Sequence, residues 1–70
     1  MRASLTLYEK QYRRMVMDNA KRMIVVYRAR ALRARRVYDR TGDRRAKIAE
    51  ARAVIMATMY SQVVAQEARA

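Results

Sequence analysis

One glycine and no proline occur in the 70 residues, so few positions can interrupt a helix. From the start of the chain to residue 40, apolar residues recur in steps of three and four, the spacing of one helix face. The lone glycine, Gly42, suits the left-handed position that ends a helix, and Thr41 or Asp43 can cap the helix that follows. The sequence therefore predicts an all-α fold of two helices joined at this glycine.

The predicted boundaries follow from these signals. We expect a long helix over about residues 5–40, a turn at 41–43 and a second helix over about 44–67. Thr6 and Glu9 have the spacing of a capping box at the start of the first helix, with Ser4 as a competing cap. The simplest architecture is an antiparallel two-helix hairpin with unequal arms, in which residues 1–70 form a single unit. One long bent helix is the alternative.

Each predicted helix carries a line of apolar residues that could contact the other helix. In the first helix this line is Ile24, Tyr27, Ala31, Ala34 and Tyr38, with Arg30, Arg33, Arg36 and Arg40 opposite. In the second helix the expected line is Ile48, Ala51, Ile55, Met59 and Val63, widened by Met56 and Tyr60. We expect the methionines at helical spacing to be core residues.

Positive charge is concentrated in the middle of the chain. The 17 Lys and Arg against six Asp and Glu give a net charge of +11, and residues 28–52 hold ten of the cations but only three anions. We call these ten the arginine pole: Arg28, Arg30, Arg33, Arg35, Arg36, Arg40, Arg44, Arg45, Lys47 and Arg52. Arginine forks well onto phosphate oxygens, and Tyr27 and Tyr38 could stack on bases if they reach the surface. The expected partner is nucleic acid, RNA first, or else an anionic lipid or acidic protein surface.

Two apolar regions are candidates for contact with neighbouring proteins. Residues 53–65 contain no charged residue, and their apolar side chains point in all directions around a helix, more than one partner helix can cover. The start of the long helix should also project beyond the shorter arm, from about residue 15 towards the N-terminus. The predicted protein-interface residues are Leu5, Leu7, Tyr8, Tyr12, Met15, Val54, Met56, Tyr60 and Val64.

The chain offers little for catalysis or metal binding. It has no Cys and no His, and its six carboxylates are isolated beside arginines, which lower rather than raise a carboxyl pKa. The two serines have no histidine to activate them, and one glycine cannot build a phosphate loop. We therefore expect no catalytic residue, no metal site and no cofactor.

These features favour a non-enzymatic structural subunit of a large assembly. The first hypothesis is a ribosomal or nucleoprotein component whose arginine pole binds RNA phosphates and whose apolar faces bind proteins. The second is an accessory or assembly subunit of a mitochondrial or other membrane-bound energy-converting complex, with the arginines on anionic lipid or acidic subunits. A free-standing DNA regulator is the least favoured, because no short recognition helix follows a positioning helix. The thirteen uncharged residues are too few to span a bilayer.

Two short segments are similar to the Leu-Tyr-Arg motif of small basic mitochondrial LYR proteins. They are Leu7-Tyr8-Glu9 and Val26-Tyr27-Arg28, and each matches two of the three residues. Neither segment carries the whole motif, so the chain is not assigned to that family. The first residues are free of acidic side chains until Glu9, as in a mitochondrial targeting helix, and no secretory apolar region is present. A mitochondrial or cytoplasmic location is expected rather than secretion.

Overall fold

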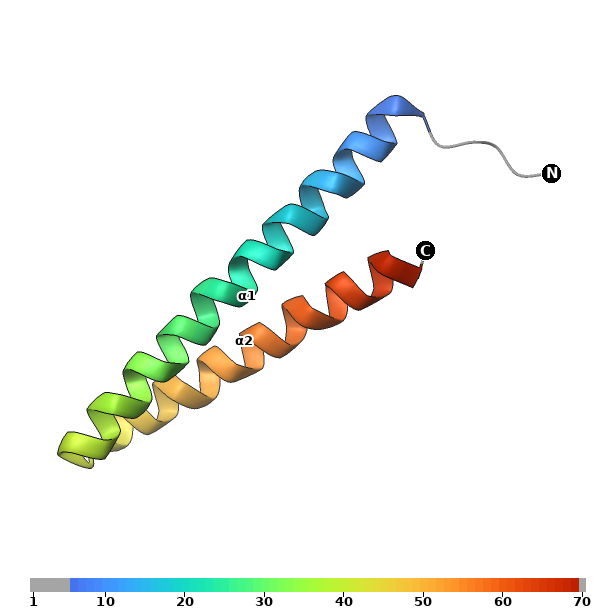
Figure 1. Cartoon of the computed structure of the whole chain (residues 1–70). Coiled ribbons are helices and arrows are strands. Elements are labelled where there is room, and N and C mark those ends of the chain that lie inside the picture. Colours follow the sequence, from blue (N-terminus) through green and yellow to red (C-terminus); the bar gives the residue numbers. More distant parts are fainter. Residues whose placement is uncertain (1–5, 70) are drawn as a thin grey trace.

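Two helices joined by a tight turn make up the protein, as seen in a computed structural model that describes residues 6–69. Helix α1 runs over Leu7–Thr41 and helix α2 over Arg44–Arg69. They lie side by side in opposite directions, and α1 extends beyond the end of α2 (Figure 1). The predicted antiparallel hairpin with unequal arms is confirmed. Leu5 and the competing cap Ser4 lie outside the described residues.

The start of α1 is fixed by the predicted capping box. The hydroxyl of Thr6 accepts a hydrogen bond from the backbone N–H of Glu9 at 3.1 Å, and the Glu9 carboxylate accepts one from the backbone N–H of Thr6 at 2.8 Å. These two bonds satisfy donors that the first turn of a helix otherwise leaves without partners. Helix α1 therefore begins where the sequence signal places it.

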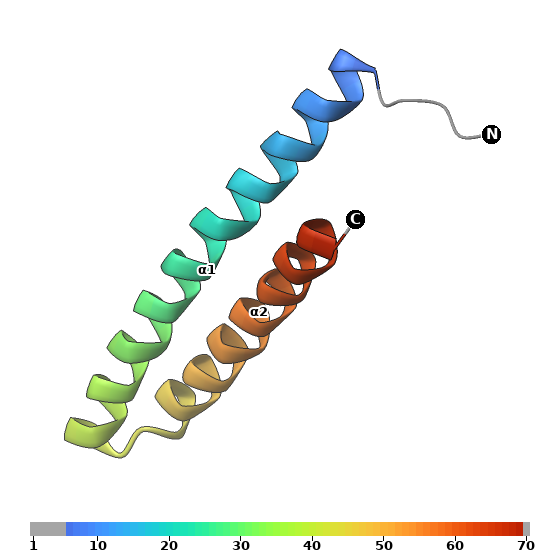
Figure 2. The same ribbon diagram turned by 45° about the vertical axis from the view of Figure 1, so that its right-hand side comes forward.

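The turn between the helices uses Gly42 as predicted. Its φ of 67° lies in the left-handed region, and its N–H donates to the Tyr38 carbonyl at 2.7 Å, which closes α1. The Asp43 carboxylate then accepts a hydrogen bond from the Arg45 N–H at 2.9 Å and caps α2. The chain reverses between Thr41 and Arg44 and brings α2 back along α1 (Figure 2).

Alanines form the centre of the contact between the helices. The three buried residues of the described chain are Ala20, Ala53 and Ala57, with 2%, 6% and 7% of their surface exposed. On α1 the predicted line is confirmed, since Ile24, Tyr27, Ala31, Ala34 and Tyr38 are all partly buried. No large side chain of the described residues is fully buried, so the hairpin has a contact seam rather than a hydrophobic core.

The predicted contact line of α2 is wrong at four of its five residues. Ile48, Ile55 and Met59 are 51%, 58% and 53% exposed, and Ala51 is exposed as well. Ile55 lies about 160° around the helix from both Ala53 and Ala57, so burying the alanines turns the isoleucine outwards. Small residues at the contact, Ala53 and Ala57 on α2 and Ala20 on α1, let the two helix axes come closer than the isoleucines would. Val63 is partly buried, as are Met56 and Tyr60, which were expected to widen the line, and the Tyr60 ring meets Tyr27 of α1.

The hairpin is long and thin. Its principal extents are 59 × 17 × 13 Å, and its radius of gyration is 16.7 Å. A compact domain of 70 residues would have a radius of gyration of about 11 Å. Most side chains therefore stay in contact with solvent, which leaves both the charged and the apolar surfaces available to partners.

Candidate nucleic-acid interface

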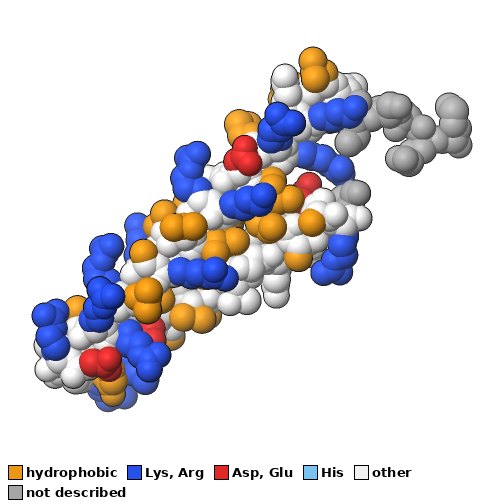
Figure 3. Space-filling model, in the orientation of Figure 1, with side chains coloured by type: hydrophobic (Ala, Val, Ile, Leu, Met, Phe, Trp, Pro, Cys, Tyr) orange, Lys and Arg blue, Asp and Glu red, His pale blue; other side chains and the backbone are white. Residues whose placement is uncertain are grey.

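The arginine pole surrounds the closed end of the hairpin. The last four turns of α1 supply six of its members, and α2 supplies the other four from its first half. All ten side chains are exposed. In the space-filling view, Lys and Arg side chains gather at the closed end and along α1 (Figure 3). The fold thus brings together cations that are up to 24 positions apart in the sequence.

Few cations of the arginine pole form an ion pair with a carboxylate of the described residues. Within the described residues, one of its ten members forms an ion pair, with Arg45 Nε 3.6 Å from Asp43 Oδ1. The other ion pair of the described chain joins Arg13 and Glu67 at the open end. Crowded like charges repel one another and create a strong positive potential. The pole is therefore suited to an external anion that carries several charges.

Three arginines of α1 form an exposed row near the closed end. Arg33, Arg36 and Arg40 follow one another at steps of three and four, which places them on one helix face over about 10 Å. Arg33 and Arg36 also line a shallow surface hollow with Val37, Asp39 and Arg40. Exposed guanidinium groups at this spacing can each contact a separate phosphate of a polynucleotide.

A second shallow hollow lies between the helices near the turn. Arg30 and Arg33 from α1 and Arg45 from α2 stand around it, and its floor is apolar, with Ala34, Val37, Ala46 and Ala49. The Asp43 carboxylate also borders this hollow. Charge from both helices therefore converges on one small area at the closed end, which the linear sequence alone does not reveal.

Tyr27 and Tyr38 each contact a cation of the arginine pole through the ring face. The guanidinium carbon of Arg30 lies 5.2 Å from the centre of the Tyr27 ring, and Nζ of Lys47 lies 4.9 Å from the centre of the Tyr38 ring. Both tyrosines are partly buried. Tyr27 also stacks with Tyr60. From the sequence we expected that bases could stack on Tyr27 and Tyr38. In the structure a base could do so only by displacing the side chains that already contact these rings.

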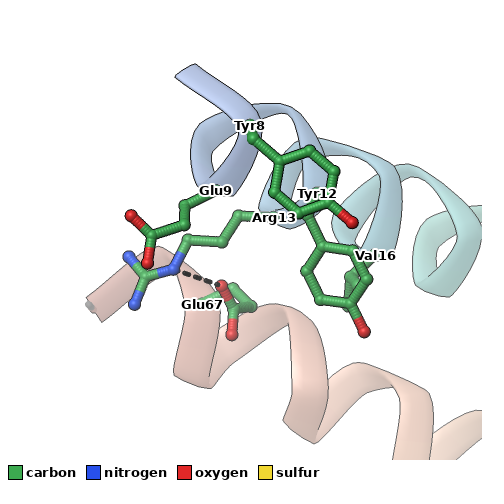
Figure 4. Close-up of a pocket in the computed structure, with 6 residues that line it drawn as sticks. All are labelled: Tyr8, Glu9, Tyr12, Arg13, Val16 and Glu67. Carbon is green, nitrogen blue, oxygen red and sulfur yellow. Dashed lines mark ion pairs between the residues drawn. The ribbon is translucent and has the colours of Figure 1, made fainter. Parts of the chain in front are cut away.

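The predicted protein-interface residues at the start of α1 are exposed. Leu7, Tyr8, Tyr12 and Met15 all lie on the surface, whereas Leu5 is outside the described residues. Tyr8, Tyr12 and Val16 line a pocket at the open end, together with Glu9, Arg13 and Glu67 (Figure 4). Arg13 Nε is 3.9 Å from Glu67 Oε1 across this pocket. Helix α2 therefore extends alongside α1 as far as Arg13, whereas the sequence predicted that it would end opposite about residue 15.

The four predicted interface residues of α2 do not share one face. Val54 is half-exposed, while Met56, Tyr60 and Val64 are partly buried. The Tyr60 ring is occupied by its contact with Tyr27. The sequence prediction missed Ile48, Ile55 and Met59 as surface residues, because it assigned them to the contact between the helices.

The periodicity of α2 does not show which of its sides meets α1. Two lines of residues there have alternating steps of four and three. The inward line runs Ala46, Glu50, Ala53, Ala57, Tyr60 and Val64, and the outward line runs Ile48, Arg52, Ile55, Met59, Gln62 and Gln66. The inward line matches the small and partly buried residues of the structure.

The acidic residues at the open end include one with a shifted pKa. Hydrogen bonds from the backbone and the hydroxyl of Thr6, helped by the nearby Arg13 charge, lower the pKa of Glu9 below its ordinary value of 4.5.

In the described part of the chain, no three acidic, Cys or His side chains come together in a way that could hold a metal ion. Neither described helix contains a stretch long and apolar enough to cross a membrane.

Comparisons with known proteins return no relative. No protein-family model matches the sequence, and searches of the curated proteins and of the solved structures find no similar protein.

Proposed function

We propose that this chain is a non-enzymatic structural subunit that binds the phosphates of nucleic acid, RNA first, through the arginine pole. One observation carries the proposal: ten exposed cations surround the closed end, and of these ten only Arg45 is paired with a carboxylate of the described residues. A polyanion neutralises such a cluster by displacing counterions, and it does so without any base-reading side chain. The proposed setting is a large assembly such as a ribosome or another nucleoprotein particle.

A salt titration tests this proposal directly. Binding of the full chain to a structured RNA, followed by fluorescence anisotropy, should weaken steeply as salt rises. If six to eight phosphates are contacted, the slope of log Kd against log salt is about 5 to 7. An affinity that does not change with salt would rule the proposal out.

A matched pair of triple variants separates the pole from net charge. Arg33→Gln, Arg36→Gln and Arg40→Gln remove three charges from the exposed row of the pole. The control variant, Arg14→Gln, Lys21→Gln and Arg22→Gln, removes three exposed charges from α1 outside the pole. We expect the first variant to lower the salt slope by about 2 to 3 and the control to change it by less than about 1. Equal losses in both variants would mean that only net charge attracts the RNA.

A second candidate function rests on two exposed apolar residues among the cations of α1. Val25 and Leu32 are 68% and 58% exposed and stand seven residues apart, with Arg28 between them. Basic residues beside apolar ones are typical of helices that lie on anionic lipid. This arrangement favours an accessory or assembly subunit of a mitochondrial or other membrane-bound energy-converting complex. Cosedimentation with vesicles of phosphatidylcholine and phosphatidylglycerol tests it by comparing the wild-type chain with Val25→Gln, Leu32→Gln. The variant should lose vesicle binding if these apolar residues enter the lipid, and it should keep that binding if charge alone attracts the chain.

A further inference from the structure

The outward side of α2 is an apolar surface that α1 does not cover. Ile48, Ile55 and Met59 are each at least half-exposed there, and we call these three residues the outer face of α2. Met56 and Val63 lie beside Met59 in a surface hollow that Tyr60, Gln62 and Gln66 complete. Large branched and thioether side chains are the kind that helices normally bury, whereas the seam of this hairpin is built on alanines.

We infer that a second copy of this chain packs against the outer face of α2, antiparallel to the first, and forms a symmetric four-helix unit. The outward line of α2 has the four-three spacing that packs one helix against another in bundles and coiled coils. With a two-fold axis between the copies, the outward line of one copy packs against the outward line of the other, so one surface forms both sides of the contact.

The exposed area of the hairpin is large enough for this contact. Its accessible surface is 6202 Å², against about 4,600 Å² for a compact monomer of the same mass. A standard protein interface takes roughly 800 Å² from each partner. The surplus covers that requirement, and the second copy covers large apolar side chains that lie on the side of α2 opposite α1.

Charge selects both the place and the direction of the contact. Ile55 and Met59, at the centre of the proposed contact, lie within residues 53–65, which carry no charge. A parallel arrangement would set two arginine poles side by side. An antiparallel arrangement points the two closed ends in opposite directions. Arg52 is then the charged residue nearest the centre of the contact line, and its two copies lie about 15 Å apart along the axis, beyond the screening length of about 8 to 10 Å in physiological salt.

The spacing of the outward line fixes one register. When Ile55 of one copy meets Met59 of the other, Arg52 meets Gln62 and Ile48 meets Gln66, so that every member of the line has a partner. The centre of this contact is then four apolar side chains, with a polar layer on each side. The two Arg52 side chains lie on opposite sides of the centre, about 15 Å apart along the axis.

Sedimentation equilibrium of the full chain tests the inference. We expect the wild-type chain to show twice its mass of 8.3 kDa at micromolar concentration. The double variant Ile55→Gln, Met59→Gln should sediment as a monomer, with a dissociation constant raised at least 100-fold. The control variant Val25→Gln, Leu32→Gln changes two equally exposed apolar residues of α1 and should remain a dimer. Because all four positions are exposed, circular dichroism should report helix in both variants.

A monomeric wild-type chain at 100 μM would overturn the inference and leave the outer face to a different protein. Equal dissociation of both double variants would overturn it as well. RNA binding by the arginine pole is measured separately, so loss of the dimer and loss of the proposed function are distinguishable.

Disulfide trapping tests the register, and the sequence has no cysteine to interfere. We expect a mixture of the Ile55→Cys chain and the Met59→Cys chain to yield mainly the mixed disulfide, which mass spectrometry resolves. A cysteine placed at Leu32 on α1 is the control and should form little disulfide. A statistical distribution of the three disulfides would contradict the pairing of residue 55 with residue 59.

Discussion

Tyr27 of α1 and Tyr60 of α2 stack across the hairpin, with ring centres 6.0 Å apart and ring planes 16° from parallel. The pair sets the position of one helix along the other, because large rings in contact tolerate little sliding. It also sets the rotation of α2, since Tyr60 shares its inward line with Ala53 and Ala57. The stacking of Tyr60 on Tyr27 therefore keeps the opposite side of α2, with Ile55, exposed.

Removing both stacked rings should cost less stability than the sum of the two single losses, because either single variant already loses the stack. We expect Tyr27→Ala and Tyr60→Ala each to lower the free energy of unfolding, with a coupling of about 0.5 to 1.5 kcal/mol in the double-mutant cycle. Urea unfolding followed by circular dichroism provides the measurement. The control is Tyr12→Ala, because Tyr12 is exposed and should matter much less. Additive losses at positions 27 and 60 would contradict the coupling.

Enlarging an alanine of the seam should push the helices apart. Ala57→Leu places a large side chain at a position that is 7% exposed, and we expect it to cost about 1 to 3 kcal/mol of stability. Ala51→Leu makes the same change on the exposed side of the same helix and should cost little. Thermal unfolding of the two variants compares them directly. Similar melting temperatures would mean that the helices are not closely packed at Ala57.

Gly42→Ala should weaken the turn through backbone strain alone. An added Cβ meets no atom within 4 Å, but the φ of 67° is unfavourable for alanine. We expect a loss of about 1 kcal/mol in unfolding free energy. Gly42→Asn should lose less, because asparagine tolerates the left-handed region better. A loss as large for asparagine as for alanine would point to a cause other than φ.

The capping box should make the start of α1 sensitive to acid. Since folding lowers the pKa of Glu9 below 4.5, its carboxylate stabilises the helix start above that pH, and the contribution is lost as the pH falls through the lowered value. Thr6→Ala removes the hydroxyl bond and should raise the pKa of Glu9 towards 4.5, which an NMR titration of the side-chain carboxyl carbon can follow. An unchanged pKa in Thr6→Ala would contradict a role for this hydroxyl.

Local signals in the sequence predicted most of the fold. The capping box at Thr6 and Glu9, the turn at Gly42 and the cap at Asp43 each depend on residues within a few positions, and all three are confirmed. The exposure of the arginine pole was also predictable, because unpaired guanidinium groups are too costly to bury. The convergence of Arg30, Arg33 and Arg45 on one hollow was not, since it depends on how α2 returns along α1.

The amino-acid sequence by itself determined two amphipathic helices, the place where the chain reverses and the position of its charge. These properties follow from helical periodicity and from the conformations that single residues can adopt. Only the tertiary structure decided which of the two apolar lines of α2 meets α1. That choice depends on the distance between the helix axes, which Ala53 and Ala57 make short and Ile48 and Ile55 would make long. Periodicity cannot distinguish the two lines, because both repeat with the same steps.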